Sequence, residues 1–86
     1  MNPRVKDVKP KDDYTLVLTF TNEEVKIFDM KPYLNIGIFK ELCDKSKYNS
    51  VRPFLGSIQW QTGQDLCPDT LYAESKSIVD VERSEA

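Results

Sequence analysis

The sequence predicts a small two-layer α+β fold, in which an antiparallel sheet of about five strands carries helices on one face. Three strand-like segments come first in the 86 residues, followed by a helical pattern, two more short strands and a closing helix. This βββ-α-ββ-α order lacks the strand–helix alternation of a parallel sheet. The 40% apolar and 30% charged fractions are those of an ordinary globular protein.

The chain is expected to divide into one α+β domain over residues 1–76 and a C-terminal tail over residues 77–86. A domain of this size buries only about 60–65% of the surface that its unfolded form exposes, so its core is thin. The tail carries β-branched residues among charges. Three states stay open for it: a frayed, flexible end, an added strand, or a segment that docks on a neighbouring molecule.

Alternating apolar residues predict the first two strands. Residues 4–10 form the first, although Val5 and Val8 have opposite parity, so either a bulge or partial cover of both faces must reconcile them. Residues 14–20 form the clearest strand. Its core face is expected to carry Tyr14, Leu16, Leu18 and Phe20.

A hairpin is expected over residues 21–24, leading to a strand over residues 25–29. Asn22 tolerates a positive φ, but Glu23 stands where glycine normally follows asparagine. The turn is therefore either strained or longer than two residues. The two faces of the strand are expected to carry Val25 and Ile27 on one side, and Phe28 and Met30 on the other.

Helical patterns fill the middle of the chain. Pro32 is placed to start a short helical turn, which Gly37 interrupts. Residues 46–50 are expected to form a polar connection. The helix between Gly37 and this connection is expected to bury Ile38, Phe39, Leu42 and Cys43.

Two short strands are expected next, over residues 51–55 and 57–60. Pro53 cannot donate a ladder hydrogen bond, so its strand lies at an edge or is bulged. The exposed edge near residues 51–55 is one of two surfaces expected to contact a partner, although short strands and Pro53 protect it, and the tail is the other.

The closing helix has a clear start. Cys67 is expected at the N-cap and Pro68 at the first helical position, with Leu66 packing on Leu71 as a hydrophobic staple. The helix is expected to run to Lys76.

The composition argues against catalysis. The chain has no histidine, which removes the Ser-His-Asp and Cys-His constellations and the histidine-containing zinc sites. Its three glycines are isolated and cannot build a phosphate-binding loop. Cys43 and Cys67 are expected to be reduced, small, buried apolar groups, with a single disulfide or a reactive thiol as the alternatives. We expect no enzymatic activity, no catalytic residue, no metal and no cofactor.

A candidate interaction or ligand surface lies in the stretch of residues 60–72. It consists of Trp60, Asp65, Asp69 and Tyr72. The two aromatic rings can stack a base or a sugar, although packing in the core is the commoner role for a single Trp. The two carboxylates flank the start of the last helix, where capping explains them without a substrate.

Charge and hydropathy restrict the partners and the location. The net charge is −2 and the basic residues are scattered among acidic ones, so we do not expect nucleic acid as a partner. No apolar run approaches the ~20 residues of a membrane span, and the N-terminus lacks the apolar core of a signal peptide. We expect no membrane partner and a cytoplasmic location.

An ordered set of short motifs runs along residues 3–75. It includes Val8-Lys9-Pro10, Asp13-Tyr14, Leu18-Thr19-Phe20, Phe28-Asp29, Pro32-Tyr33-Leu34, Gly37, Gly56, Trp60, Gly63, Asp65-Leu66, Pro68-Asp69 and Leu71-Tyr72. This set resembles the bacterial family called domain of unknown function 2442. The resemblance implies a small bacterial α+β domain, related in fold to the N-terminal domain of NE-type nitrifier proteins of unknown role.

The resemblance also implies stand-alone chains, some encoded beside another small protein in arrangements like toxin–antitoxin pairs, and it offers no catalytic residues to transfer. We therefore expect a non-enzymatic protein-interaction or regulatory module, antitoxin-like in such a pair. Its partner would be the product of a neighbouring gene or a second copy, which would give a homo-oligomer. The alternatives are a nucleic-acid-binding regulator and a small ligand-binding domain around Trp60, Asp65 and Tyr72.

Overall fold

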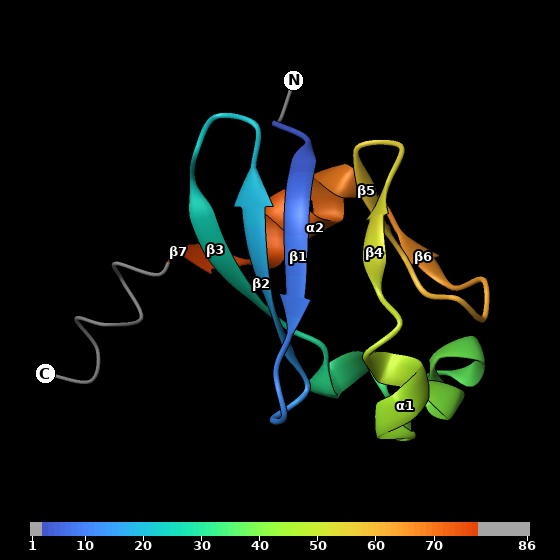
Figure 1. Ribbon diagram of the computed structural model, residues 1–86. Coiled ribbons are helices and arrows are strands. Elements are labelled where there is room, and N and C mark those ends of the chain that lie inside the picture. The colour runs from blue at the N-terminus through green and yellow to red at the C-terminus, as the bar shows by residue number, and fades with distance from the viewer. Residues whose placement is uncertain (1–2, 78–86) are drawn as a thin grey trace, which may run out of the picture.

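The computed structural model describes residues 3–77, which form two antiparallel sheets and four short helical segments (Figure 1). The strands are β1 (Val5–Pro10), β2 (Thr15–Phe20), β3 (Val25–Asp29), β4 (Arg52–Phe54), β5 (Ser57–Gln59), β6 (Asp65–Leu66) and β7 (Lys76–Ser77). The 3₁₀ helices are η1 (Lys31–Tyr33) and η2 (Gly37–Cys43), and the α-helices are α1 (Lys45–Tyr48) and α2 (Pro68–Glu74).

The α+β class is confirmed, but the strands form two sheets in place of one sheet of about five. Their orders are β1-β2-β3-β7 and β4-β5-β6. The sheets meet where β1 lies beside β4 (Figure 1), and the Val5 N–H donates to the Gly56 carbonyl at 2.9 Å. Pro53, in the middle of β4, has no N–H to donate across this seam, which keeps the ladders separate. The prediction that Pro53 lies on an edge strand is confirmed.

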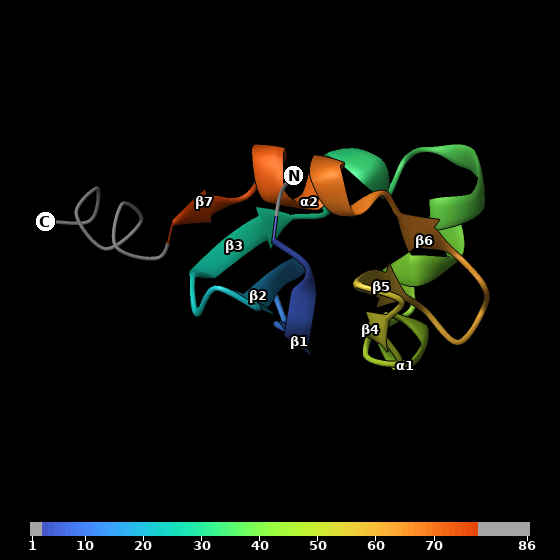
Figure 2. The same ribbon diagram turned by 90° about the horizontal axis from the view of Figure 1, so that it is seen from above.

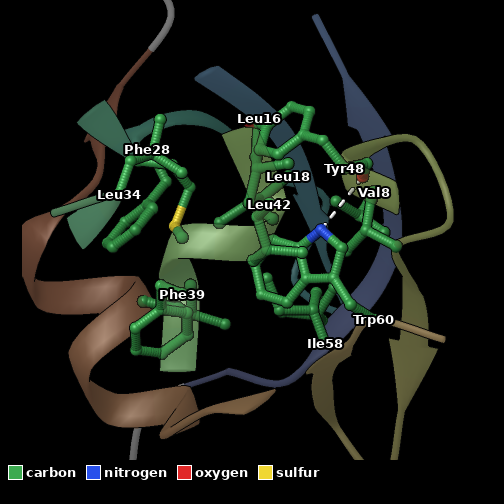
Figure 3. Close-up of a cluster of buried hydrophobic side chains, with 14 of the residues drawn as sticks. Val8, Leu16, Leu18, Phe28, Leu34, Phe39, Leu42, Tyr48, Ile58 and Trp60 are labelled. Carbon is green, nitrogen blue, oxygen red and sulfur yellow. Dashed lines mark hydrogen bonds between the residues drawn. The ribbon is translucent and has the colours of Figure 1, made fainter. Parts of the chain in front are cut away.

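The two sheets curve around a shared interior, and α2 lies across its open side (Figure 2). The predicted core face of β2 is confirmed for three residues, since Leu16, Leu18 and Phe20 are all fully buried. The prediction for β3 is also confirmed, because Phe28 and Met30 face inward with 1% and 0% of their surface exposed. Figure 3 shows side chains from both sheets and from the helical segments meeting in this core.

Local irregularities accompany the first hairpin. The register of β1 shifts between Val5 and Asp7, and both Val5 and Val8 are buried, so the predicted bulge is confirmed. Tyr14 was expected within the second strand, but it precedes β2 with a φ of 63° and is only half-buried. It belongs to the turn and not to the alternating core face.

The second helical segment differs from its prediction. It is the 3₁₀ helix η2, in which side chains at i and i+3 eclipse each other, so only Phe39 and Leu42 point into the core. Ile38 is 67% exposed and Cys43 is also exposed, against the expectation that both are buried. Cys67 is exposed as well, because it sits at the N-cap of α2 outside the packed face. Both cysteines are free, as expected.

Residues 46–50 do not form a plain polar connection. The Asp44 carboxylate accepts the Ser46 N–H at 2.9 Å and starts α1, which ends with Tyr48 fully buried. The carbonyl of Tyr48 accepts the indole N–H of Trp60 at 2.9 Å, the dashed line in Figure 3. This one-turn helix thus fixes the position of the single Trp.

The start of the closing helix is confirmed and its end is corrected. Cys67 is the N-cap of α2, Pro68 follows it, and Leu71 is fully buried. The helix ends at Glu74 and not at Lys76, because the backbone becomes extended and residues 76–77 pair with β3. The expectations for the tail beyond Ser77 fall on residues 78–86, which lie outside the described part of the chain.

Candidate functional site

The turn between β4 and β5 is an apolar projection with a strained backbone. Leu55 and Gly56 occupy its two central positions with φ values of 49° and 81°. Two-residue hairpin turns with positive φ at both positions favour Asn-Gly, because asparagine and glycine tolerate the left-handed region. A leucine there costs on the order of 1–2 kcal/mol. No burial compensates for this, since Leu55 is 85% exposed.

The tip is anchored to the rest of the fold by a packing contact and a hydrogen bond. A Cβ added at Gly56 would lie 2.6 Å from Cδ of Arg4, so the Arg4 side chain packs directly on this glycine. The hydrogen bond from Val5 to Gly56 adds a backbone anchor. Leu55 is therefore presented by a fixed turn, with Phe54 beside it at 37% exposure.

A hollow of about 400 Å³ lies between this tip and the junction of β6 with α2. The small, buried side chain of Ser57 is part of its wall and donates a hydrogen bond to the Leu66 carbonyl. The hollow is lined by Phe54, Leu55, Ser57, Ile58, Asp65, Leu66, Cys67 and Pro68. We call Leu55, Phe54 and this hollow the tip patch.

Charged groups of both signs flank the tip patch. The registers of β4, β5 and β6 place Arg52, Gln59 and Asp65 in one row across the sheet. The neighbouring Ile58 is fully buried, and side chains alternate along a strand, so this row lies on the outer face. Arg52 and Asp65 are both exposed, and the Arg52 guanidinium lies 5.4 Å from the Phe54 ring centroid.

The two aromatic members of the predicted surface are used inside the fold. Trp60 is only 1% exposed and packs on Phe39 and Tyr48. Tyr72 is half-buried, with its ring 5.1 Å from that of Phe20 and its hydroxyl donating to the Glu24 carboxylate at 2.6 Å. That hydrogen bond raises the pKa of Tyr72 and lowers the pKa of Glu24. Trp60 thus offers almost no surface to a ligand.

The two acidic members lie near the start of α2. Asp65 is exposed on β6 and lines the hollow. Asp69 is exposed in the first turn of α2, where a carboxylate complements the positive end of the helix dipole. The structure therefore brings Asp65 to the tip patch, whereas Trp60 contributes to the core.

Leu55 and Phe54 were not among the four residues of the predicted surface, but both fall in the strand edge near residues 51–55 that was expected to contact a partner. A signal for them was present in the sequence, because Leu-Gly stands at the centre of a hairpin where Asn-Gly is usual. Recognising this signal requires knowing that Phe54 pairs with Ser57, so that only Leu55 and Gly56 form the loop. The sequence around these two residues does not show that pairing by itself.

A second apolar area lies around η2. Ile36 and Ile38 are 53% and 67% exposed, beside a hollow of about 570 Å³. The buried amide of Gln64 in its wall is committed to the fold, since it donates to the Ile38 carbonyl at 2.6 Å and to the Glu41 carboxylate at 2.8 Å. This area carries no comparable strained residue, so it is a suitable control surface for the tip patch.

Two kinds of feature are absent from residues 3–77. No group of three or more His, Cys, Asp or Glu side chains in this part of the chain is arranged to hold a metal ion. No helix in the same part is both long and apolar enough to cross a membrane.

Comparison with known proteins places the described domain in a family. A family model described as "Protein of unknown function (DUF2442)" matches residues 5–77. No curated protein and no solved structure matches the chain.

Proposed function

The chain belongs to the DUF2442 family, and we propose that it is a non-enzymatic module that binds a protein partner through the tip patch. The observation that carries the proposal is Leu55. Its positive φ lowers stability, and its apolar side chain is almost fully exposed, so no burial within the chain offsets that cost. Such a residue is accounted for if it fills a pocket on a partner, where burying a leucine contributes about 1.5–3 kcal/mol.

The surroundings of Leu55 suit a protein better than a small substrate. Phe54 and the hollow give an apolar centre, and Arg52 and Asp65 give a charged rim, which is the usual layout of a protein interface. The chain has no histidine, and the hollow contains no pair of carboxylates. The partner is either the product of a neighbouring gene or a second copy of the chain.

Capture from the native host tests this function. The tagged wild type is expected to retain a stoichiometric protein partner, another protein or itself, and the variant Leu55→Asn is expected to lose it. Asparagine tolerates the left-handed backbone, so the variant should be at least as stable as the wild type, and lost binding cannot be attributed to unfolding.

The matched control is Ile38→Asn, which removes another exposed apolar side chain, from the area around η2. It is expected to retain the partner. Capture of nothing by the wild type, or full retention by Leu55→Asn, would exclude the proposal.

A further inference from the structure

We infer that the partner of the tip patch is a second copy of this chain, bound face to face about a two-fold axis that runs parallel to β5. The inference rests on the proposed function, because it uses the same apolar anchor. It goes further by naming the partner and by predicting which residues meet across the interface.

The tip patch is complementary to itself. Leu55 projects from it at 85% exposure, and the hollow of about 400 Å³ lies directly beside that projection. A two-fold interface uses the same patch on both partners. Because the projection and the hollow are neighbours in one patch, Leu55 of each copy can enter the hollow of the other.

The charges fit the same rotation. Arg52 lies on β4 and Asp65 lies on β6, with β5 between them. A half-turn about an axis parallel to β5 exchanges the positions of β4 and β6. Arg52 of one copy then faces Asp65 of the other, and the contact occurs twice in the dimer. Two sheets packed face to face lie about 10 Å apart, a gap that facing arginine and aspartate side chains can bridge.

The rotation also directs Leu55 into the hollow. Because β4 and β6 are both antiparallel to β5, they run in the same direction. Leu55 follows β4 and Cys67 follows β6, so both lie at the same end of the sheet. Exchanging the strands therefore seats Leu55 of one copy beside Cys67 and Pro68 of the other, and these two residues line the hollow. One axis satisfies the apolar and the charged contacts together.

The interface is small. Its strands contain only two or three residues each, whereas a stable interface takes about 800 Å² from each partner. We therefore expect a dimer that dissociates on dilution through the micromolar range.

Charge exchange gives the first test, read by sedimentation equilibrium over a concentration series. Arg52→Asp and Asp65→Arg are each expected to weaken self-association about ten-fold, because like charges then meet across the axis. The variant with both changes is expected to associate nearly as well as the wild type, since opposite charges meet again. Lys40→Asp, an exposed charge change on η2, is the control and is expected to have no effect.

A cross-link gives the second test, which reads geometry directly. The cysteine introduced by Leu55→Cys is expected to form a disulfide with Cys67 of the other copy on mild oxidation. The oxidant is a small disulfide, which takes up the two electrons and two protons and is reduced to two thiols. Two such bonds form in each dimer. A covalent dimer on a non-reducing gel shows that they join two chains, a bond within one chain gives no such dimer and contradicts the geometry, and peptide mass spectrometry identifies the linked cysteines. Adding Cys67→Ser should abolish the link, and adding Cys43→Ser should leave it unchanged.

The outcomes separate the inference from the proposed function. A wild-type chain that stays monomeric at all concentrations, or a double charge variant as weak as the single ones, overturns the two-fold dimer. If such a monomer still captures a different protein through Leu55, the proposed function stands with another partner. If Leu55→Asn changes neither self-association nor capture, both are overturned.

Discussion

Tyr48 combines a structural role with an unpaired polar group. Its side chain is fully buried, its ring packs on Trp60, and its carbonyl holds the Trp60 indole. Within the described part of the chain, however, its hydroxyl has no hydrogen-bond partner. Burial raises the pKa of Tyr48, and the carboxylates of Asp13 and Asp29 raise it further, so the hydroxyl stays neutral in the fold.

Replacing Tyr48 by phenylalanine should stabilise the protein. Tyr48→Phe keeps the ring contacts and removes a buried hydroxyl without a partner, so the free energy of unfolding should rise by about 1 kcal/mol. Urea unfolding followed by Trp60 fluorescence measures it. The control is Tyr14→Phe, which removes a hydroxyl that donates to the Cys43 carbonyl and should lower stability. A loss of stability in Tyr48→Phe would contradict the prediction.

Single residues were predictable where their pattern was local. Leu16 and Leu18 alternate within one strand, and alternation alone gave their burial. Tyr48 ends a one-turn helix among polar neighbours, which is too short to show a period. The exposure of Leu55 depends on the turn type and on the seam with β1, and both are set by contacts that are distant in sequence.

Three hairpin connections share one geometry. Tyr14, Glu23 and Gly63 have φ values of 63°, 71° and 101°, and each N–H donates to the carbonyl three residues earlier, at 3.2, 3.0 and 2.9 Å. This is a type I turn followed by a left-handed residue, a common three-residue loop. The turn over residues 21–23 is therefore longer than two residues, as one of the two alternatives predicted, and its last residue, Glu23, also has the strained left-handed backbone of the other.

The equivalence of these loops predicts opposite effects at two positions. Gly63→Ala should lower the free energy of unfolding by about 1 kcal/mol through its φ alone, because nothing lies within 4 Å of the added Cβ. Glu23→Gly should raise it by about 0.5 kcal/mol, since the backbone gain is partly offset by the exposed ion pair with Lys6 at 3.1 Å. Chemical denaturation measures both. Shifts of the same sign would show that the loops are not equivalent.

Elements were predictable where a boundary is set by its own residues. Pro68 specifies the start of α2 through its fixed φ, and Cys67 takes the N-cap position before it without a side-chain cap. The end of α2 was not, because residues 76–77 leave the helix to pair with Lys26 and Ile27 of β3. The division into two sheets likewise depends on how β1 meets β4, which no local pattern shows.

At the scale of the whole molecule, side-chain contacts join α2 to the hairpin of β2 and β3. The Tyr72 hydroxyl donates to the Glu24 carboxylate at 2.6 Å, across 48 positions in the sequence. The Lys26 ammonium donates to the Tyr72 carbonyl at 2.9 Å and lies 3.8 Å from the ring centroid. These contacts were not predictable from the sequence, because they form only after the helix has packed on the sheet.

The Glu24–Tyr72 contact makes stability depend on pH on the acid side. The hydrogen bond from Tyr72 is the largest cause that lowers the pKa of Glu24 below its usual 4.5, and Asn22 adds to it. The folded state therefore holds its proton less tightly than the unfolded state. Its contribution to stability is present above pH 4.5 and is lost as pH falls through the folded pKa. Asp13 and Asp44 act in the same direction, through hydrogen bonds from Thr15 and Ser46.

Removing the Tyr72 hydroxyl should weaken this dependence. In Tyr72→Phe the pKa of Glu24 returns toward 4.5, so the variant should be less stable than the wild type at pH 7 and should lose less stability on acidification. The free energy of unfolding of both proteins, measured from pH 7 to pH 3, should therefore converge below pH 4.5. The control is Tyr14→Phe, which removes a hydroxyl that donates to a backbone carbonyl. Because a carbonyl does not titrate, the difference in free energy of unfolding between this variant and the wild type should be independent of pH. A constant offset for Tyr72→Phe would mean that the hydroxyl stabilises the fold without favouring the charged carboxylate.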